Sequence, residues 1–280
     1  MGIVNATPDS FSDGGKHIEA DEFIGHCQGL IKNGASILDI GAESTAPLSL
    51  EVSSDIELQR FEKTLFMWVD KEALFPDILT IDTYKYQTFK KVYQRLERSH
   101  FKGRIFWNDV SGKLDHDFEL FEKEMPSQVG YIYCHNLAPT RRDSQKHHLH
   151  ILPDEIFFDQ FINYFKQAQQ FLKESKRDIW WDPCFGFSKN TDQNKILLDR
   201  FDEFINELGD QSKIVVGISK KRFLKEEGER LDDPADLLKI ETRHQQALVS
   251  LLKKNPMADF VFRVHDPEIL YLLDWNKHSS

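Results

Sequence analysis

The chain has 280 residues, of which 40% are hydrophobic and 29% are charged, so it is not a disordered, collagenous or coiled-coil protein. Its formal net charge of −10 disfavours a protein that coats a phosphate backbone, which excludes nucleic acid as the main partner. The length suits one large α/β domain or two small ones.

Eight short segments rich in β-branched and aromatic residues predict β-strands, in chain order at residues 2–5, 36–40, 78–82, 104–109, 129–134, 178–182, 213–217 and 259–263. They are almost continuously apolar, as is typical of strands buried on both faces of a parallel sheet. Segments with helical spacing lie between them, at residues 22–34, 86–99, 157–175 and 240–254. This alternation predicts an α/β fold, a (β/α)8 TIM barrel in which residues 1–280 form a single domain.

Polar side chains follow the predicted strands at their carboxyl ends. They are Asn5, Thr45, Asp82, Asn108, Asp109, His135, Asn136, Asp182, Ser219, Lys221, Arg263 and His265. Because the carboxyl ends of barrel strands meet at one mouth, we expect these side chains to converge on an active site there. The alternative is that they are ordinary loop residues, since Asn and Asp are common in turns.

The loop after the first strand, residues 5–15, places two Asp, three hydroxyl residues and two Gly around Phe11, which suits a lid over a charged substrate. Residues 220–222 place three cations where barrels often bind anions. Together with Thr45 and Arg263 they predict a phosphate or diphosphate site. A hydrogen-bonding heterocycle is predicted beside it, with acceptors and an amide from Asp82, Asn108 and Asp182.

Seven segments of the chain together resemble the signature segments of the dihydropteroate synthases. They are GIVNATPDSFSDGG (2–15), ILDIGAEST (37–45), IDTYK (81–85), NDVSG (108–112), DPCFGFSKN (182–190), GISKKRFL (217–224) and FRVHD (262–266). The resemblance implies a TIM-barrel transferase of folate biosynthesis that depends on Mg²⁺. Such an enzyme condenses 6-hydroxymethyl-7,8-dihydropterin diphosphate with p-aminobenzoate, giving 7,8-dihydropteroate and diphosphate.

The resemblance also implies a role for individual residues. The pterin ring would be bound by Asp82, Asn108, Asp182 and Lys221. The metal ion would lie near Asn5, Asp9 and Asp13, and the diphosphate would contact Thr45, Arg263 and His265. The p-aminobenzoate would be surrounded by Phe11, Pro47, Phe187, Lys221 and Arg222. The implied catalytic residues are Asn5, Thr45, Lys221, Arg263 and His265.

The chain departs from the family pattern at three places. After Glu43-Ser44-Thr45 the family usually has an Arg that contacts diphosphate, whereas this chain has Ala46. Losing such a contact slows turnover by about ten- to a hundredfold unless another cation, such as Lys16 or Arg60, compensates. The fifth strand ends in Tyr133-Cys134-His135-Asn136 where the family more often has Met-His-Met, and Lys220 replaces a usual Arg.

Two other functions stay open at this point. A degenerate, weakly active or inactive pterin-binding homologue would explain Ala46, but it would not need the diphosphate residues Asn5, Arg263 and His265. A pterin-dependent methyltransferase would share the pterin residues but not the first loop.

Other features add expectations about location and metal sites. The chain has no apolar run of bilayer length and no signal peptide, so we expect a cytoplasmic protein, and its relatives suggest a homodimer. Three cysteines without CxxC spacing indicate neither a disulfide framework nor a structural zinc site. His147, His148 and His150 lack a carboxylate or Cys at ligand spacing, so we expect them in a solvated loop or at a helix end.

Overall fold

The computed structural model describes residues 1–7, 16–43, 51–71, 73–209, 212–230 and 232–271. Its centre is one parallel sheet in which eight strands lie in chain order. They are β1 (Gly2–Asn5), β2 (Ile37–Gly41), β3 (Ile78–Asp82), β4 (Arg104–Asp109), β5 (Gly130–Cys134), β6 (Ile179–Asp182), β7 (Lys213–Val216) and β8 (Asp259–Phe262). All eight predicted strands are therefore confirmed, and each predicted strand end agrees with the observed one to within one residue.

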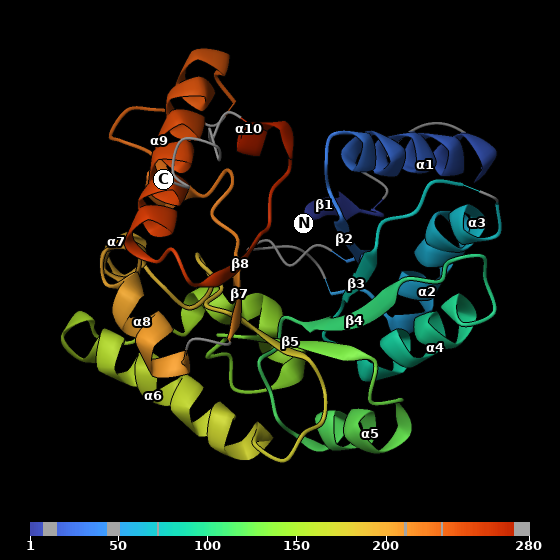
Figure 1. Ribbon diagram of the computed structural model, residues 1–280, viewed down its shortest axis with the longest axis horizontal. Coiled ribbons are helices and arrows are strands. Elements are labelled where there is room, and N and C mark those ends of the chain that lie inside the picture. Colours follow the sequence, from blue (N-terminus) through green and yellow to red (C-terminus); the bar gives the residue numbers. More distant parts are fainter. Residues whose placement is uncertain (8–15, 44–50, 72, 210–211, 231, 272–280) are drawn as a thin grey trace.

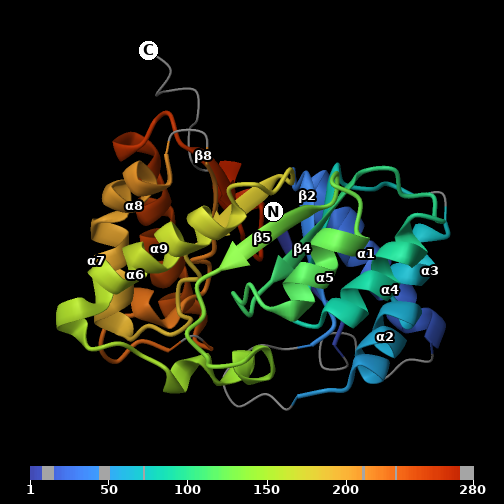
Figure 2. The ribbon, with the colours of Figure 1, turned by 90° about the horizontal axis from the view of Figure 1, so that it is seen from below.

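Helices cover the outside of this sheet. They are α1 (Lys16–Lys32), α2 (Ser54–Lys63), α3 (Leu65–Val69), α4 (Tyr86–Leu96), α5 (His116–Glu124), α6 (Asp154–Leu172), α7 (Thr191–Asp199), α8 (Phe201–Leu208), α9 (Pro234–Lys254) and α10 (Glu268–Tyr271), with the 3₁₀ helices η2 (Arg141–Leu149) and η3 (Arg222–Leu224). Around the strands, helices α1 to α5 lie on the right of Figure 1 and α6 to α9 on the left, and Figure 2 shows the same two groups from below.

The sheet curls until its first and last strands meet. The amide of Ile3 donates to the carbonyl of Val264 at 3.0 Å, and the amide of Val264 donates to the carbonyl of Met1 at 2.9 Å. The terminal ammonium of Met1 donates to the carbonyl of Phe262 at 2.9 Å. The edge groups of β1 and β8 thereby gain hydrogen-bond partners, and the polar ends of all the strands point the same way.

Side chains alternate along each strand between two hydrophobic clusters. Phe106 of β4 and Ile132 of β5 belong to a small cluster enclosed by the sheet. Their neighbours Trp107 and Tyr133 belong to the large cluster between the sheet and the helices. Because successive side chains of a strand point to opposite faces, this parity decides which polar residues at the strand ends face the enclosed side.

One buried arginine caps a helix from a distant loop. Arg177, which precedes β6, donates from Nη2 to the carbonyls of Phe121 and Met125, at 3.1 and 2.7 Å. It donates from Nη1 to the carbonyls of Pro126 and Val129, at 2.6 and 3.0 Å. These bonds gather carbonyls at and just beyond the end of α5, where the last carbonyls of a helix lack intrahelical partners, although those of Phe121 and Pro126 also accept a backbone amide.

We expect Arg177→Met to lower the free energy of unfolding by about 3 kcal/mol, because several buried carbonyls lose their donor at once. Urea denaturation followed by circular dichroism measures this. Arg104→Met is the matched control, since Arg104 is exposed, pairs with Asp178 at the surface and lies over the ring of Phe106 at 4.9 Å, and it should cost less than about 1 kcal/mol. Equal losses in the two variants would contradict the capping role.

Candidate active site

Parity and register bring one set of polar side chains together inside the sheet. Asp82 at the end of β3 lies in register with Asn108 of β4, and Asp182 at the end of β6 lies in register with Cys134 of β5. These residues follow enclosed-face positions such as Phe106, Ile132 and Trp180 at intervals of two. The structure therefore places Asp82, Asn108 and Asp182 on the enclosed side of the sheet, with Asp82 and Asp182 close enough to interact electrostatically.

The centre of this group is Asp39, a buried carboxylate within β2. Asn108 donates from Nδ2 to both of its oxygens at 3.1 Å, and the hydroxyl of Thr80 donates to Oδ1. Arg263 donates from Nε to Oδ2 at 2.6 Å. From its place between Leu38 and Ile40, Asp39 could be either a pocket wall or a buried group bonded to backbone. In the structure its hydrogen bonds come from side chains, and it lies at the centre of the site.

Arg263 also reaches the predicted pterin residue Asp82. Its Nη2 lies 3.1 Å from Oδ2 of Asp82, and about a fifth of its side chain, 22%, stays exposed. The guanidinium therefore joins the carboxylates of β2 and β3 and keeps one face toward solvent. In this arrangement Arg263 neutralises part of the charge of Asp39 and Asp82, which form the floor of the site, and it is also a candidate diphosphate contact.

Asp82 is poised to accept a further hydrogen bond. Its Oδ1 is buried and has no hydrogen-bond partner among the described residues. Burial and the neighbouring charge of Asp39 raise the pKa of Asp82 to about 8, although Arg263 opposes the shift. Burial likewise raises the pKa of Asp182, whose Oδ1 accepts the amide of Cys184 at 2.6 Å. Buried carboxyl groups of this kind indicate a ligand-binding site.

The loop after β6 is held by a buried lysine. The ammonium of Lys189 donates to the carbonyls of Pro183, Cys184 and Phe187 at 2.7, 3.2 and 3.0 Å, and it lies 2.9 Å from Nδ1 of His135. Burial lowers the pKa of Lys189 to about 7. The cation of the DPCFGFSK segment therefore holds the loop from its buried side.

Lys221 and Phe187 meet at the rim. The ammonium of Lys221 lies 5.6 Å from the ring centroid of Phe187, and burial together with Arg263 lowers the pKa of Lys221. Phe187 is half-buried and stacks on His147, with centroids 3.9 Å apart. Arg222 begins η3 and is exposed. The expectation of a solvated His147 is wrong, because its ring is buried as the platform under Phe187.

Two other predicted residues lie at neighbouring strand ends. Asn5 is exposed at the end of β1. His265 is half-buried beyond β8, and its Nδ1 lies 3.1 Å from the hydroxyl of Ser219. Burial and the nearby charges of Lys220 and Arg263 lower the pKa of His265 to about 4, so its imidazole is neutral at pH 7. The remaining predicted site residues, Asp9, Phe11, Asp13, Thr45 and Pro47, lie outside the described residues.

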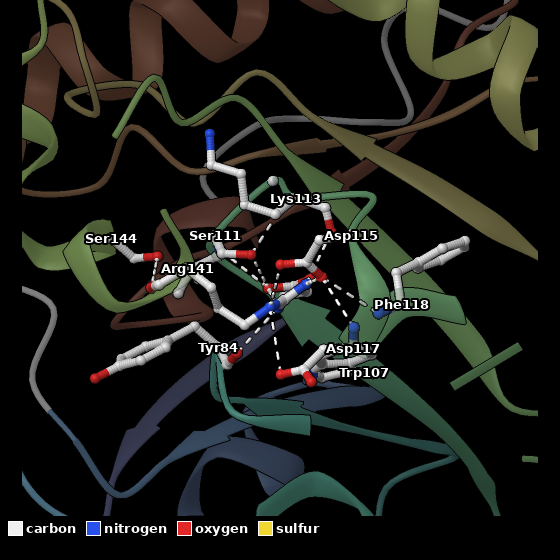
Figure 3. A network of polar contacts seen from close by, with 12 residues as sticks. Tyr84, Trp107, Ser111, Lys113, Asp115, Asp117, Phe118, Arg141 and Ser144 are labelled. Atoms are coloured by element: carbon white, nitrogen blue, oxygen red, sulfur yellow. Dashed lines mark hydrogen bonds and ion pairs between the residues drawn. The ribbon is translucent and has the colours of Figure 1, made fainter. Parts of the chain in front are cut away.

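Three polar residues at strand ends do not reach this group, contrary to expectation. Asp109 is fully buried and binds Nη1 of Arg141 through both oxygens at 2.8 Å. Arg141 also pairs with Asp115 in the same network (Figure 3). His135 packs against α6, and Asn136 donates to backbone carbonyls at 2.9 and 3.1 Å. Asp109 and His135 each follow a residue of the enclosed face, so parity turns them outward.

Ion pairs brace the start of the second loop. Glu43 accepts the amide of Val52 at 3.0 Å, so it joins the two ends of the segment that contains Thr45 and Ala46. Lys85 binds Glu43 and also donates to the carbonyl of Val52 at 2.7 Å. Arg60, one of the two cations considered as a substitute for the missing Arg, donates to the carbonyl of Ala42 at 2.6 Å. Its guanidinium therefore lies beside this loop.

Comparison with known proteins assigns this arrangement to a family. The family described as pterin binding enzyme matches residues 1–265. A dihydropteroate synthase of Streptococcus pyogenes serotype M3 is 32% identical over 226 residues, which are 80% of this chain and 76% of that protein. The chain therefore belongs to the pterin-binding enzyme family that includes the dihydropteroate synthases.

Solved structures agree with this assignment. The Xanthomonas albilineans dihydropteroate synthase with 4-aminobenzoic acid has a TM-score of 0.74 at 25% identity and covers 100% of this chain and 93% of its own. The Clostridium difficile dihydropteroate synthase, solved in the presence of pteroic acid, has a TM-score of 0.73 at 26% identity over 97% and 92% of the two chains. Among the described residues, no helix has the length and apolar character needed to cross a membrane.

The raised pKa of Asp82 predicts a pH dependence of stability. Between its ordinary value near 4 and about 8, the folded chain holds a proton that the unfolded chain releases, so the free energy of unfolding falls as the pH rises through this interval. We expect Asp82→Asn to flatten that fall, measured by urea denaturation across the pH range. Asp178→Asn, at an exposed surface pair, should leave the slope unchanged. Equal slopes in wild type and Asp82→Asn would contradict the assignment.

Proposed function

We propose that this protein is a dihydropteroate synthase, a transferase of folate biosynthesis. It joins 6-hydroxymethyl-7,8-dihydropterin diphosphate to p-aminobenzoate and releases 7,8-dihydropteroate and diphosphate. The observation that carries the proposal is the enclosed group of Asp82, Asn108 and Asp182, in which Oδ1 of Asp82 is buried without a partner among the described residues. The likeness to dihydropteroate synthases in sequence and structure supports it.

The chemistry of the floor fits a pterin ring. A pterin presents an amino group and ring N–H donors along one edge, and the carboxyl oxygens of Asp82 and Asp182 can accept hydrogen bonds from them. The amide of Asn108 is held by Asp39, so its orientation is set before the ligand arrives. Lys221 would donate to the ring carbonyl or nitrogen from the opposite rim. Such preorganised polar groups give specificity for the heterocycle.

The diphosphate would lie toward the ends of β1, β2 and β8. Neutral His265 can donate a hydrogen bond to a phosphoryl oxygen while Ser219 holds its other ring nitrogen. Arg263 keeps an exposed face for the same purpose, and Thr45 would add a hydroxyl. These groups stabilise the charge that grows on the leaving diphosphate.

The side-chain oxygen of Asn5 fits Mg²⁺, because this ion prefers oxygen ligands and Asn5 is exposed at the strand end. Asp9 and Asp13 of the first loop would complete the set of oxygens. When bound, the ion would neutralise part of the diphosphate charge.

In the reaction itself, the bond between the pterin methylene and the diphosphate oxygen breaks as the electron-rich dihydropterin shares the positive charge. The neutral arylamine then attacks the methylene and loses a proton to water. No obligatory general base is needed, so the residues of this chain act by positioning and electrostatics. The aminobenzoate would lie between Phe187, Lys221 and Arg222, with Phe11 and Pro47 from the first two loops.

We further propose that the curled sheet is a single-domain (β/α)8 TIM barrel and that the protein acts as a cytoplasmic homodimer. The chain-order parallel sheet with hydrogen bonds between its first and last strands supports the barrel. Analytical ultracentrifugation of the purified chain tests the dimer, and a monomer at micromolar concentration would contradict it.

The synthase activity predicts release of diphosphate when purified protein is given the dihydropterin diphosphate, p-aminobenzoate and Mg²⁺, with dihydropteroate identified by mass spectrometry. We expect Asp182→Ala to lower kcat/KM by at least about a hundredfold, because a buried acceptor for the pterin is lost. Asp178→Asn, four residues earlier at a half-buried position, keeps an acceptor for the indole of Trp180 and should retain full activity. Pterin binding without turnover in the wild type would instead support the degenerate homologue.

Ala46 gives a second test of that alternative. We expect Ala46→Arg to raise kcat/KM by about tenfold, because a charge-assisted contact to a phosphoryl group is restored in a loop whose two ends Glu43 and Val52 already join. Steady-state kinetics measure the change, with Ala46→Met as the control of similar size without charge. An unchanged rate combined with a large loss in Arg60→Met would show that Arg60 already supplies the missing cation.

A further inference from the structure

The carboxyl ends of β5 and β6 bring two thiols and a carboxylate together. One side-chain oxygen of Asp182 and the sulfur atoms of Cys134 and Cys184 all lie within 4.8 Å of one another. All three residues are buried. In the described part of the chain, no other group of three or more His, Cys, Asp or Glu side chains is clustered in this way.

The register of β5 with β6 and the turn at Cys184 hold these groups in place. Cys134 and Asp182 are partners in the register of β5 and β6. Cys184 follows two residues later and turns back toward Asp182, because its amide donates to Oδ1 at 2.6 Å and its φ is 49°. A non-glycine residue seldom adopts a positive φ, and this one brings the thiol of Cys184 to the enclosed side.

We propose that Cys134, Asp182 and Cys184 form a binding site for a thiophilic divalent cation of the Zn²⁺ class. Zn²⁺ binds sulfur at about 2.3 Å and carboxylate oxygen at about 2.0–2.2 Å, which separates neighbouring ligands in a tetrahedron by about 3.5–3.8 Å. The three donor atoms need to approach one another by only about 1 Å to reach this geometry. The fourth position is left for water or for a ligand in the cavity.

The surrounding charges fit such a site. Each thiol loses its proton to solvent as its metal–sulfur bond forms, so two thiolates and one carboxylate bring a charge of −3 to a +2 ion. The ammonium groups of Lys189 and Lys221 both interact electrostatically with Asp182 and Cys184. They offset the remaining negative charge of the complex.

This site differs from the Mg²⁺ site at Asn5 in both place and chemistry. Mg²⁺ prefers oxygen ligands and rarely binds thiolates, whereas two sulfur ligands select Zn²⁺ and similar soft cations. The thiophilic ion would instead compete with the pterin. Asp182 would be a ligand of the thiophilic ion and also an acceptor for the pterin, so the ion excludes the pterin. This last step rests on the proposed function, whereas the metal binding itself does not.

Titration of the full chain with Co²⁺ in reducing buffer free of chelators tests the metal site directly. We expect one equivalent to bind and to give a thiolate-to-cobalt charge-transfer band that Zn²⁺ abolishes. Mutation of a residue that only hydrogen-bonds a metal ligand typically lowers metal affinity by roughly 10- to 100-fold. Removal of a ligand itself, in Cys134→Ala or Cys184→Ala, should therefore lower it by at least about 100-fold. Cys27→Ala is the matched control, because Cys27 is a buried thiol on α1 outside the cluster.

Two results would overturn the metal site. One is the absence of a charge-transfer band in the wild type, and the other is a band that persists in both cluster variants. Cys184→Gly is a second variant that suits the positive φ of this position and so keeps the fold. It should lose the band in the same way as Cys184→Ala.

Competition with a pterin tests the overlap. At a Zn²⁺ concentration about 100 times its own Kd, the apparent Kd for pteroic acid should rise about 100-fold in the wild type. In Cys134→Ala, whose affinity for Zn²⁺ should be at least about 100-fold weaker, it should rise no more than about twofold. Simultaneous binding of both ligands to the wild type would overturn the overlap. Pteroic acid binding without any metal tests the proposed function separately. If that fails while the cobalt band is present, the proposed function is wrong and the metal site stands.

Discussion

A buried carboxylate within the second strand, Asp39, constrains the architecture of the whole site. A charge in an apolar interior is tolerated only when several donors surround it. Its donors come from three other strands: Thr80 within β3, Asn108 near the end of β4 and Arg263 just beyond β8. The sheet must curl for Arg263 to reach Asp39, so satisfying this one carboxylate requires the same closure that the backbone bonds between β1 and β8 produce. Fold and site are thus two results of one constraint.

The same network leaves one buried oxygen, Oδ1 of Asp82, without a hydrogen-bond donor among the described residues, and a ligand can supply that donor. Arg263 pairs with Asp39 and Asp82, but it contacts only one oxygen of Asp82. The other oxygen stays buried without a partner among the described residues, and the pKa of the carboxyl group rises. A heterocycle with N–H donors at this position would provide the missing hydrogen bonds. Stability is given up in the free protein, and binding recovers it.

Much of the fold and part of the site follow from local patterns in the sequence. The strands were predictable because each consists largely of one short run of β-branched and aromatic residues. Asp82, Asn108 and Asp182 were predictable as site residues because they lie at the carboxyl ends of such runs. Asp109 and His135 end their runs too, but they lie one position out of phase with the enclosed face and bind Arg141 and Lys189 instead. Those partners are distant in the sequence, so only the three-dimensional packing could reveal them.

The loops after β6 and β7 have their own source of strain. Three non-glycine residues there, Cys184, Ser188 and Lys220, adopt positive φ values of 49°, 50° and 56°. Each such residue costs of order 1 kcal/mol or more, and it persists only where surrounding contacts hold it. In the loop after β6, the ammonium of Lys189 supplies those contacts by donating to three backbone carbonyls. The strained backbone at Cys184 directs its amide to Asp182. It also keeps the thiols of Cys134 and Cys184 beside the carboxylate that the ligand must reach.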